Sequence, residues 1–434
     1  MAKFLKLLLS AFFAALSVIF FLYPLLHSAW RLASDPGIRS TAPSELAFRS
    51  HASLSDRVPD YVEKRIASGK AETLEVHQIT ATEWPVYGAF FYLIATENLQ
   101  EQWEKDSSLA SRAPAESRKE AIEASLRIML DEGHAHWVKD YWGEDYLEDP
   151  NCFYRMRYIG CLSSHYQLTG DESHLPLLRE VTEDLVDDFD NSPHGLLDDY
   201  PNQCFPADVV CAIAMIRRAD LALGIDRGDW AKNALHRVMG NFNNGLPPYT
   251  ASERTGWAAT PSRGCTNGFF FAFVGEIDEE LGRSLYKKYC DDFWQENFFT
   301  KGWREFRRGP DDEGFYYDPD SGPVISDIGC AATGLGLGAA RFFGDSKRTS
   351  ALSTQLLASA TPLPSGRLLI PSLVADHEHA PLFPEIVMLH QLSISSEGGE
   401  TATSIPLIAW ILWLLQGLLA FVFLRWSWRL VKRS

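Results

Sequence analysis

Two long apolar runs lie near the ends of the chain. Leu7–Trp30 comprises 24 residues without a formal charge, and Ile405–Leu424 comprises 20. Each run can cross about 30 Å of hydrocarbon as a helix. The first exceeds the roughly 7–15 apolar residues of a signal peptide, and no small-x-small cleavage site follows it. We expect an uncleaved anchor over residues 1–30 and a transmembrane helix over 405–425. The alternatives are a cleaved signal peptide and a buried core helix, respectively.

A second pattern repeats between these runs, in which an apolar stretch ends at a turn and an acidic, amphipathic stretch follows. Glycines mark four of the turns, at positions 170, 224, 275 and 344. Glycine accepts the left-handed conformation that ends a helix, and the Asp, Glu or Ser that follows caps the next one. Helices that are apolar all round belong inside a domain, whereas amphipathic helices cover it.

This alternation predicts an all-α domain over residues 81–398, with an (α/α)6 barrel of helical hairpins as its architecture. Almost no stretch shows the alternation of a strand. An open stack of hairpins is the alternative. Residues 31–80 are polar, and we expect an irregular lead-in with a helix near Tyr61–Ala67. A basic tail occupies residues 426–434.

The barrel prediction places a pocket before any residue is chosen. If the inner helices run in the same direction, the segments that lead into them form the rim at one end. These segments are rich in Tyr, Trp, Asp and Glu, and they cover residues 79–87, 141–155, 194–208, 246–264 and 311–327. Aromatic walls with a few carboxylates are typical of a small-molecule or sugar pocket.

Composition and charge narrow the function. The 434 residues include 46% hydrophobic residues, which excludes a disordered chain. The formal net charge is −17, from 40 basic and 57 acidic residues, so nucleic acid is an unfavourable partner.

The basic residues also predict an orientation in the membrane. Two precede the first run and four follow the second: Lys3, Lys6, Arg425, Arg429, Lys432 and Arg433. By the positive-inside rule both termini are cytoplasmic, and the domain lies outside, in the periplasm of a Gram-negative cell. Because residues 1–30 and 405–434 contain no Asp or Glu, the segment between them carries net charge −23. We expect it to stand off anionic lipid headgroups.

Cysteines and histidines give no metal-site pattern. The seven cysteines show no CxxC and no zinc-like spacing, and we expect most to be small buried residues, with a disulfide left open. His134 and His136 form one H-x-H and His377 and His379 another, but solvated or core histidines explain both better. Without a phosphate-binding loop or a Ser–His–Asp constellation, we predict neither a metal nor a cofactor.

Four rim residues are candidate catalytic groups: Asp199, Asp208, Tyr87 and Asp327. Two carboxylates at one rim can take opposite roles as acid and base. Pro206 suits the first position of an inner helix, which puts Asp208 in its first turn, where the helix dipole favours it without any catalytic role. Tyr87 begins an inner helix and should point into the bore.

Further rim residues are candidates for substrate binding. Arg157 lies within an apolar helix and needs a partner, either a rim carboxylate or the substrate. The others are Trp84, Asp198, Tyr200, Tyr249, Trp257, Cys265, Tyr316 and Tyr317.

Residues 151–170, NCFYRMRYIGCLSSHYQLTG, resemble an inner helix of the linalool dehydratase/isomerase family in the Asn, the Tyr followed by a basic residue, the YQL and the closing TG. The stretch HGLLDDYPNQCFPAD that follows is similar to that family's loop of Gly, aliphatic, acidic and Pro residues. The resemblance runs over about residues 83–345. It implies an (α/α)6 barrel, sometimes assembled into rings, with an acid–base pocket for a small alcohol. A homo-oligomer is therefore expected.

The chain departs from this family at several functional positions. The linalool enzyme uses two cysteines, a histidine, tyrosines and an N-terminal aspartate. Tyr87 matches one tyrosine, whereas Arg157 stands at the histidine position and Cys265 at a tyrosine position. The acidic residues of segment 194–208 lie at or near the cysteine positions. No clear counterpart of the aspartate precedes Tyr87.

Three functions therefore compete. The first is a membrane-anchored lyase or isomerase that acts on a small alcohol in a small, mostly apolar, dry pocket. The second is a glycoside hydrolase or polysaccharide lyase, which requires an open groove with carboxyl groups roughly 5–10 Å apart. The third is a non-catalytic binding or scaffold module of the envelope, with the pocket filled by side chains.

Overall fold

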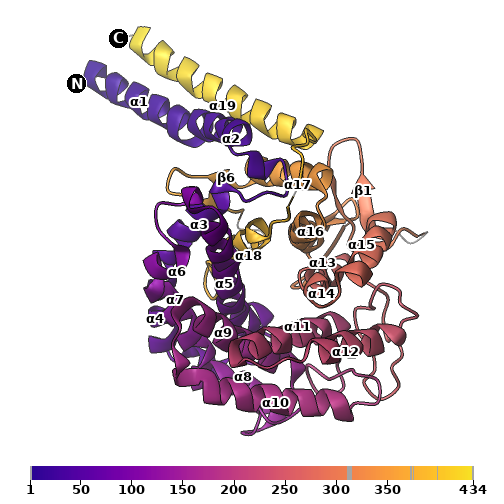
Figure 1. The fold of residues 1–434 in the computed structure, drawn as a ribbon. Helices are drawn as coiled ribbons and strands as arrows, with labels where there is room; N and C mark the ends of the chain where they lie inside the picture. Colours follow the sequence, from indigo (N-terminus) through magenta and orange to yellow (C-terminus); the bar gives the residue numbers. More distant parts are fainter. Residues whose placement is uncertain (1, 310–314, 372–373, 375, 398, 433–434) are drawn as a thin grey trace.

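The computed structural model describes residues 2–309, 315–371, 374, 376–397 and 399–432, and it is mostly helical, with 66% helix and 7% strand (Figure 1). The predicted predominance of helix is confirmed. Residues 311–314 of one rim segment and Arg433 of the basic tail lie outside the described residues.

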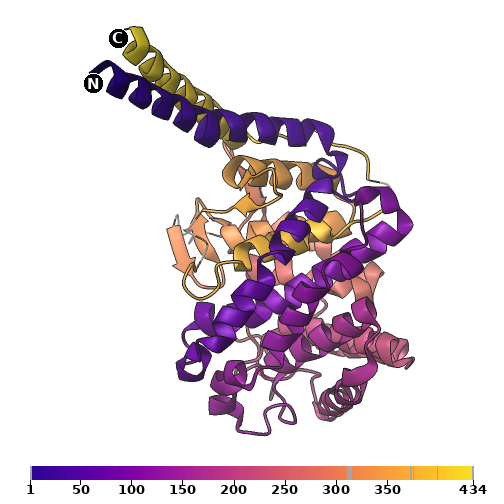
Figure 2. The ribbon, with the colours of Figure 1, turned by 90° about the vertical axis from the view of Figure 1, so that its left-hand side faces the viewer.

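The two apolar runs form a helical hairpin. Ala2–Ser17 (α1), Val18–Leu22 (η1, a π-turn) and Tyr23–Ser34 (α2) make one continuous helix, and Leu407–Lys432 (α19) makes the other. Both are long and apolar enough to cross a membrane. They extend past the predicted ends at residues 30 and 425, so most of the expected basic tail is helical. Figures 1 and 2 show them projecting together from the rest of the protein, with both termini at the far end.

Small residues join the two helices of this hairpin. Ser10 Oγ donates to the Ser427 carbonyl at 2.9 Å, and Ser17 Oγ donates to the Ala420 carbonyl at 2.7 Å. The pairing of an early residue with a late one shows that the helices are antiparallel. Small side chains let the backbones approach, and hydroxyl-to-carbonyl bonds suit an environment without water.

Within the described residues, six helices that are mainly apolar form an inner ring. They are α5 (Ile79–Lys105), α9 (Cys152–Thr169), α11 (Pro206–Leu223), α13 (Gly264–Phe270), α16 (Cys330–Phe342) and α18 (Phe383–Ser393). Each contacts the next, and α18 contacts α5, so the ring closes (Figure 1).

Amphipathic helices cover the ring, and an outer helix precedes each inner one along the chain. They are α3 (Glu45–Ser55), α4 (Val58–Ala67), α7 (Lys119–Met129), α10 (Leu175–Asn191), α12 (Gly228–Gly240), α15 (Glu279–Phe293) and α17 (Ser346–Ser359). In α10, buried Leu178, Val181, Leu185 and Phe189 recur at helical spacing and face the ring. The hydrophobic core lies between the two layers.

Short elements complete the chain. The remaining helices are η2 (Pro36–Ile38), η3 (Lys70–Thr73), η4 (Ser107–Leu109), α6 (Pro114–Ser117), α8 (Glu132–Trp142), η5 (Glu172–His174) and α14 (Val274–Ile277). Antiparallel pairing joins β1 (Trp294–Glu296) to β2 (Lys301–Trp303), β4 (Gly322–Ile325) to both β3 (Phe315–Asp318) and β5 (Ile328–Gly329), and β6 (Thr361–Pro362) to β7 (Leu368–Leu369).

The glycine turns are confirmed at three positions and wrong at one. Gly170, Gly224 and Gly344 have φ of 69°, 67° and 77° and follow the ends of their helices. Gly275 lies inside α14 instead. A Cβ there would come within 2.1 Å of the Phe342 ring, so this glycine permits close helix packing rather than a left-handed turn.

The irregular lead-in predicted for residues 31–80 is wrong at α3, which packs on α5 and α18, whereas α4 (Val58–Ala67) confirms the helix expected near Tyr61–Ala67. The polar residues that made this segment look irregular in the sequence are buried and have partners inside the protein. His51 Nε2 lies 2.9 Å from Thr96 Oγ1, and Ser55 Oγ lies 2.7 Å from Tyr92 Oη. The lead-in is therefore part of the outer layer and not a spacer from the membrane.

Arg341, at the end of α16, holds this lead-in against the ring. Its guanidinium is fully buried and donates to the backbone carbonyls of Gly37, Ser40, Ala42 and Ile394. A buried carbonyl without a partner costs about 1–3 kcal/mol.

Replacing this side chain should loosen the lead-in. We expect Arg341→Ala to lower the free energy of unfolding by about 3 kcal/mol or more, since several carbonyls lose their donor together. Thermal unfolding of the detergent-solubilised protein, followed by circular dichroism, measures the change. Arg283→Ala is the control, because Arg283 is 58% exposed and pairs with Glu279 on the surface of α15. Equal melting temperatures for the two variants would contradict this role of Arg341.

Candidate functional site

A cavity of about 1550 Å³ lies at the N-terminal ends of the inner helices. Each inner helix contributes from its first turns, as Glu83 and Tyr87 do from α5, Asp208 from α11 and Cys265 from α13. Seven of the predicted site residues line it: Trp84, Tyr87, Tyr200, Asp208, Tyr249, Cys265 and Tyr317. Its walls are otherwise mostly apolar and aromatic.

Asp208 is the centre of the polar group in this cavity. Pro206 is the first residue of α11 and Phe205 its N-cap, as predicted, so Asp208 lies in the first turn. Its Oδ1 atom lies 3.4 Å from Arg157 Nη2 and 3.5 Å from the Tyr87 hydroxyl. Burial raises the pKa of Asp208 to about 6, although Arg157 opposes the rise. At neutral pH this carboxyl is therefore mainly ionised, and its pKa lies close to that pH.

Arg157 is fully buried on α9 and held by aromatic rings. Its Cζ lies 3.5 Å from the ring centroids of both Tyr87 and Phe153, and Nη1 donates to the Phe153 carbonyl. Cation–π contacts of this kind are strongest away from water. The rim carboxylate expected as a partner of this buried arginine is therefore Asp208, which lines the cavity.

Glu83 is a second acidic group of the cavity, and sequence reasoning missed it. It lies on α5 one turn before Tyr87, and Tyr200 Oη donates to its Oε1 at 2.6 Å. Burial raises the pKa of Glu83 to about 8, and Asp320 and Asp208 add to the rise. This carboxyl is therefore mainly protonated at neutral pH. Its spacing of four residues from Tyr87, which puts both on one helix face, is the signal that could have found it.

Asp199 lies behind this cluster rather than in the cavity wall. It is fully buried, and its Oδ2 accepts a hydrogen bond of 2.8 Å from the Phe205 backbone N–H. Its Oδ1 has no hydrogen-bond partner within the described part of the chain. Burial and the charge of Asp208 hold the pKa of Asp199 well above its usual range. Asp199 is therefore a buried neighbour of Asp208 whose ionisation is disfavoured.

A second polar group faces the cavity from α13 and the β-strands. Tyr249 donates to Asp320, and the Cys265 thiol lies 2.9 Å from Glu305 Oε1, which also accepts from Arg263 Nε at 2.7 Å. Burial raises the pKa of Glu305 to about 7 and also that of Asp320. Neither acid carries a signal in the sequence, because both come from irregular segments near short strands.

Two predicted residues serve turns and do not themselves line the cavity. Asp327 and Ser326 form the two-residue connection between β4 and β5, with φ of 69° and 50°. Asp327 pairs with Arg304 at 3.3 Å, so a turn and an ion pair account for it. Asp198 accepts the Asn202 backbone N–H at 2.6 Å and stabilises its own turn.

Two predicted aromatic residues also lie outside the cavity lining. Trp257 is 76% exposed on a surface loop. Tyr316 donates to Asp318 at 2.7 Å, whereas its neighbour Tyr317 points the other way along β3 and lines the cavity. The alternation of β3 separates the two tyrosines, and the sequence did not predict that strand.

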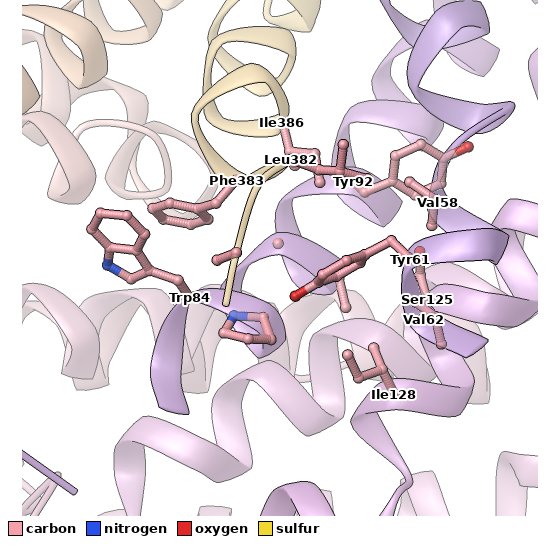
Figure 3. Close-up of a pocket in the computed structure, with 14 residues that line it drawn as sticks. Val58, Tyr61, Val62, Trp84, Tyr92, Ser125, Ile128, Leu382, Phe383 and Ile386 are labelled. Atoms are coloured by element: carbon pink, nitrogen blue, oxygen red, sulfur yellow. The ribbon is translucent and has the colours of Figure 1, made fainter. Parts of the chain in front are cut away.

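A much smaller cavity lies between α4, α5, α7 and α18 (Figure 3). Its volume of about 20 Å³ is close to that of a single water site. Trp84 and Phe383 line both cavities, with ring centroids 4.6 Å apart. The small cavity is a gap in apolar packing behind the wall of the large one.

The cysteines and histidines behave as ordinary side chains. All seven cysteines are unpaired thiols, five of them buried. Among the described residues, no group of three or more His, Cys, Asp or Glu side chains is arranged to hold a metal ion. His134 lies 2.9 Å from Asp131 and 3.1 Å from Arg65 Nε, and His379 lies 3.2 Å from Asp376.

No protein-family model matches this sequence, and no curated protein is significantly similar to it. The site is therefore interpreted from its own geometry.

The raised pKa of Glu83 makes a prediction about stability. In the unfolded chain the pKa of Glu83 is near 4.5, so below that pH Glu83 is protonated in both the folded and the unfolded state. Between that pH and about pH 8, Glu83 is ionised in the unfolded chain but protonated in the folded protein, so the free energy of unfolding falls as pH rises. We expect Glu83→Gln to match the wild type at pH 4 and to be more stable at pH 9. The gain should be on the order of 3 kcal/mol, since part of Glu83 faces the cavity.

Denaturant unfolding at both pH values measures this difference. Glu104→Gln, an exposed change on the same helix, is the control and should be neutral at both. If Glu83→Gln also left the free energy of unfolding unchanged at pH 9, the inference that burial destabilises ionised Glu83 would be wrong.

Proposed function

We propose that the protein is a membrane-anchored acid–base lyase or isomerase whose inner and outer helices form an (α/α)6 barrel. The observation that carries this is the presence of two carboxyl groups with different pKa values in one mostly apolar cavity. Glu83, with a pKa of about 8, holds a proton at neutral pH, while Asp208, with a pKa of about 6, has lost its proton. Two carboxyl groups whose environments separate their pKa values can act as acid and base.

The reaction that suits this pair is the loss of water from an alcohol. Glu83 gives its proton to the hydroxyl oxygen, and the C–O bond breaks with its electrons leaving on water. Asp208 then takes a proton from the neighbouring carbon, whose C–H electrons form the new double bond. Isomerisation follows if water returns to a different carbon. Each cycle moves one proton from Glu83 to Asp208, and transfer back through water resets the pair.

The surrounding residues assist both halves of this reaction. Arg157 and Tyr87 hold the Asp208 carboxylate in place. The side chains of Phe269 and Phe91 line the cavity and stabilise positive charge on the substrate carbon by cation–π attraction. The apolar wall limits water, which strengthens these electrostatic effects.

The mainly apolar lining of the cavity favours this function over its competitors, whereas its volume exceeds what a compact alcohol fills. A glycan would need many polar groups along an open groove, whereas the walls here are mostly hydrocarbon. A scaffold module would have its pocket filled by side chains, and about 1550 Å³ is open here.

We propose the orientation that the basic residues predict, with both termini in the cytoplasm and the barrel outside. The antiparallel hairpin supports this, because it places both chain ends on one side of a bilayer and the barrel on the other. Basic residues cluster at that shared end.

Activity should follow a bell-shaped pH profile. We expect kcat/KM to rise with a midpoint near pH 6, as Asp208 loses its proton, and to fall with a midpoint near pH 8, as Glu83 loses its proton. The test uses full-length protein in nanodiscs with a panel of allylic and tertiary alcohols, and chromatography detects the alkenes. Glu83→Gln and Asp208→Asn should each reduce turnover by roughly 10²-fold or more.

Asp198→Asn is the matched control, because Asp198 does not itself line the cavity and Asn can accept the same N–H bond. Hydrolysis of aryl glycosides in place of alcohol dehydration would select the glycosidase alternative. Turnover that survives both Glu83→Gln and Asp208→Asn would exclude acid–base chemistry at this pair.

A further inference from the structure

The wall of the large cavity continues from the acid–base pair to the base of the membrane hairpin. The residues at that end come from the β1–β2 turn, the end of α17 and the first turns of α19: Phe299, Thr300, Leu356, Ser359, Ile408 and Leu412. The Ile408 backbone N–H donates to the Phe299 carbonyl at 2.8 Å, which fixes the turn against α19. Figure 1 shows the loop beyond β1 rising towards the base of this helix.

The base of α19 is also packed firmly on the barrel. Ala358 of α17 is buried with Ala409 and Trp413 of α19, and Ser28 of α2 donates to the Leu357 carbonyl at 3.2 Å. The cavity therefore reaches the level at which the hairpin leaves the barrel, with no spacer between them.

Large aromatic side chains stand exposed around this end of the cavity. Phe298 and Phe299 are 79% and 52% exposed, and Trp410 on α19 is 54% exposed. Asn297 stiffens the turn, because its Oδ1 accepts the backbone N–H groups of Phe299 at 2.9 Å and Thr300 at 2.7 Å. Exposed apolar patches are unfavourable in water, whereas aromatic residues beside the end of a membrane helix suit the lipid interface.

The size and lining of the cavity indicate a long, mainly apolar occupant. Its volume of about 1550 Å³ exceeds the range of roughly 300–1,000 Å³ for ordinary small-molecule pockets. Between the polar group at Asp208 and the base of α19, the wall includes Phe269, Leu335, Val387 and Met388. A compact alcohol would leave most of this space unfilled.

We propose that the cavity takes its substrate from the bilayer, through a mouth formed by the β1–β2 turn and the first turn of α19. The substrate class is an amphiphile with a hydroxyl group on a long hydrocarbon chain. The hydroxyl reaches Glu83 and Asp208, and the chain lies along the apolar wall towards the membrane. The hydroxyl rests on the proposed function, whereas the route and the chain rest on the cavity alone.

Photo-crosslinking in vesicles tests this without relying on turnover. Full-length protein is reconstituted in phosphatidylcholine vesicles with a long-chain alcohol that carries a diazirine in mid-chain, and labelled peptides are identified by mass spectrometry. We expect label at Val387, Phe269 and Leu356, inside the cavity. The double variant Phe298→Asp and Phe299→Asp should reduce this labelling about tenfold, since two apolar groups no longer enter the interface.

Two matched controls isolate the mouth. Leu221→Asp changes an apolar residue that is 70% exposed at the C-terminal end of α11, and it should leave the labelling unchanged. Ser359→Trp narrows the mouth from an exposed position and should reduce cavity labelling severalfold, whereas Ser107→Trp, on η4, should not.

The outcomes separate this inference from the proposed function. Label confined to the lipid-facing surfaces of α1 and α19 overturns the inference. Equal cavity labelling in the wild type and both mouth variants also overturns it. Cavity labelling without dehydration of the probe supports the bilayer route and refutes the proposed reaction. Dehydration of short, water-soluble alcohols with no cavity labelling supports the reaction and refutes the route.

Discussion

The site depends on one buried guanidinium among several carboxyl groups. Arg157 lies between the rings of Tyr87 and Phe153 and offers its charge to Asp208. Asp199 and Glu83 lie close enough to share the same field, but Arg157 stabilises mainly the ionised form of Asp208. Several carboxylates cannot all ionise in a medium of low dielectric constant, so the protein keeps some of them neutral. This division of charge gives the site an acid and a base.

The fold creates that situation by bringing helix N-termini together. An outer helix precedes each inner one, so the inner helices enter the ring from one end and their first turns line one cavity. Burial there makes ionisation costly, while the hydroxyls of Tyr87 and Tyr200 supply hydrogen bonds to the acids. The base of the membrane hairpin packs on the same end of the protein through α17. The cluster of acidic residues and the base of the hairpin therefore share one cavity wall.

The sequence predicted the parts of this structure that depend on local patterns. Apolar stretches located most of the inner helices, although not α18, and both membrane-length helices, and Pro206 placed Asp208 in the first turn of α11. Local patterns failed where partners are distant. The segment of α3 was predicted to be irregular because it is polar, and the partners of its buried polar groups, such as Thr96 for His51, lie on another helix. Asp327 was predicted as a rim acid because no apolar pattern in the sequence marks the turn between β4 and β5 that contains it.

Glu83 shows the same limit within the site itself. Its position one turn before Tyr87 is visible in the sequence, but its raised pKa arises from burial and from Asp320 and Asp208, which come from other segments. Cys265 and Tyr249 were predicted, whereas their partners Glu305 and Asp320 were not. The position of a side chain on a helix can be predicted from a sequence pattern, but the charge state of a buried group depends on neighbours that only the tertiary structure brings together.

The central claim is that Glu83 is protonated and Asp208 is ionised at neutral pH. Infrared titration of the full-length protein tests it most directly, with the carboxyl C=O bands assigned by their loss in Glu83→Gln and Asp208→Asn. We predict that the Asp208 band disappears near pH 6 and that the Glu83 band persists until about pH 8. Disappearance of both bands together near pH 4 would contradict the account.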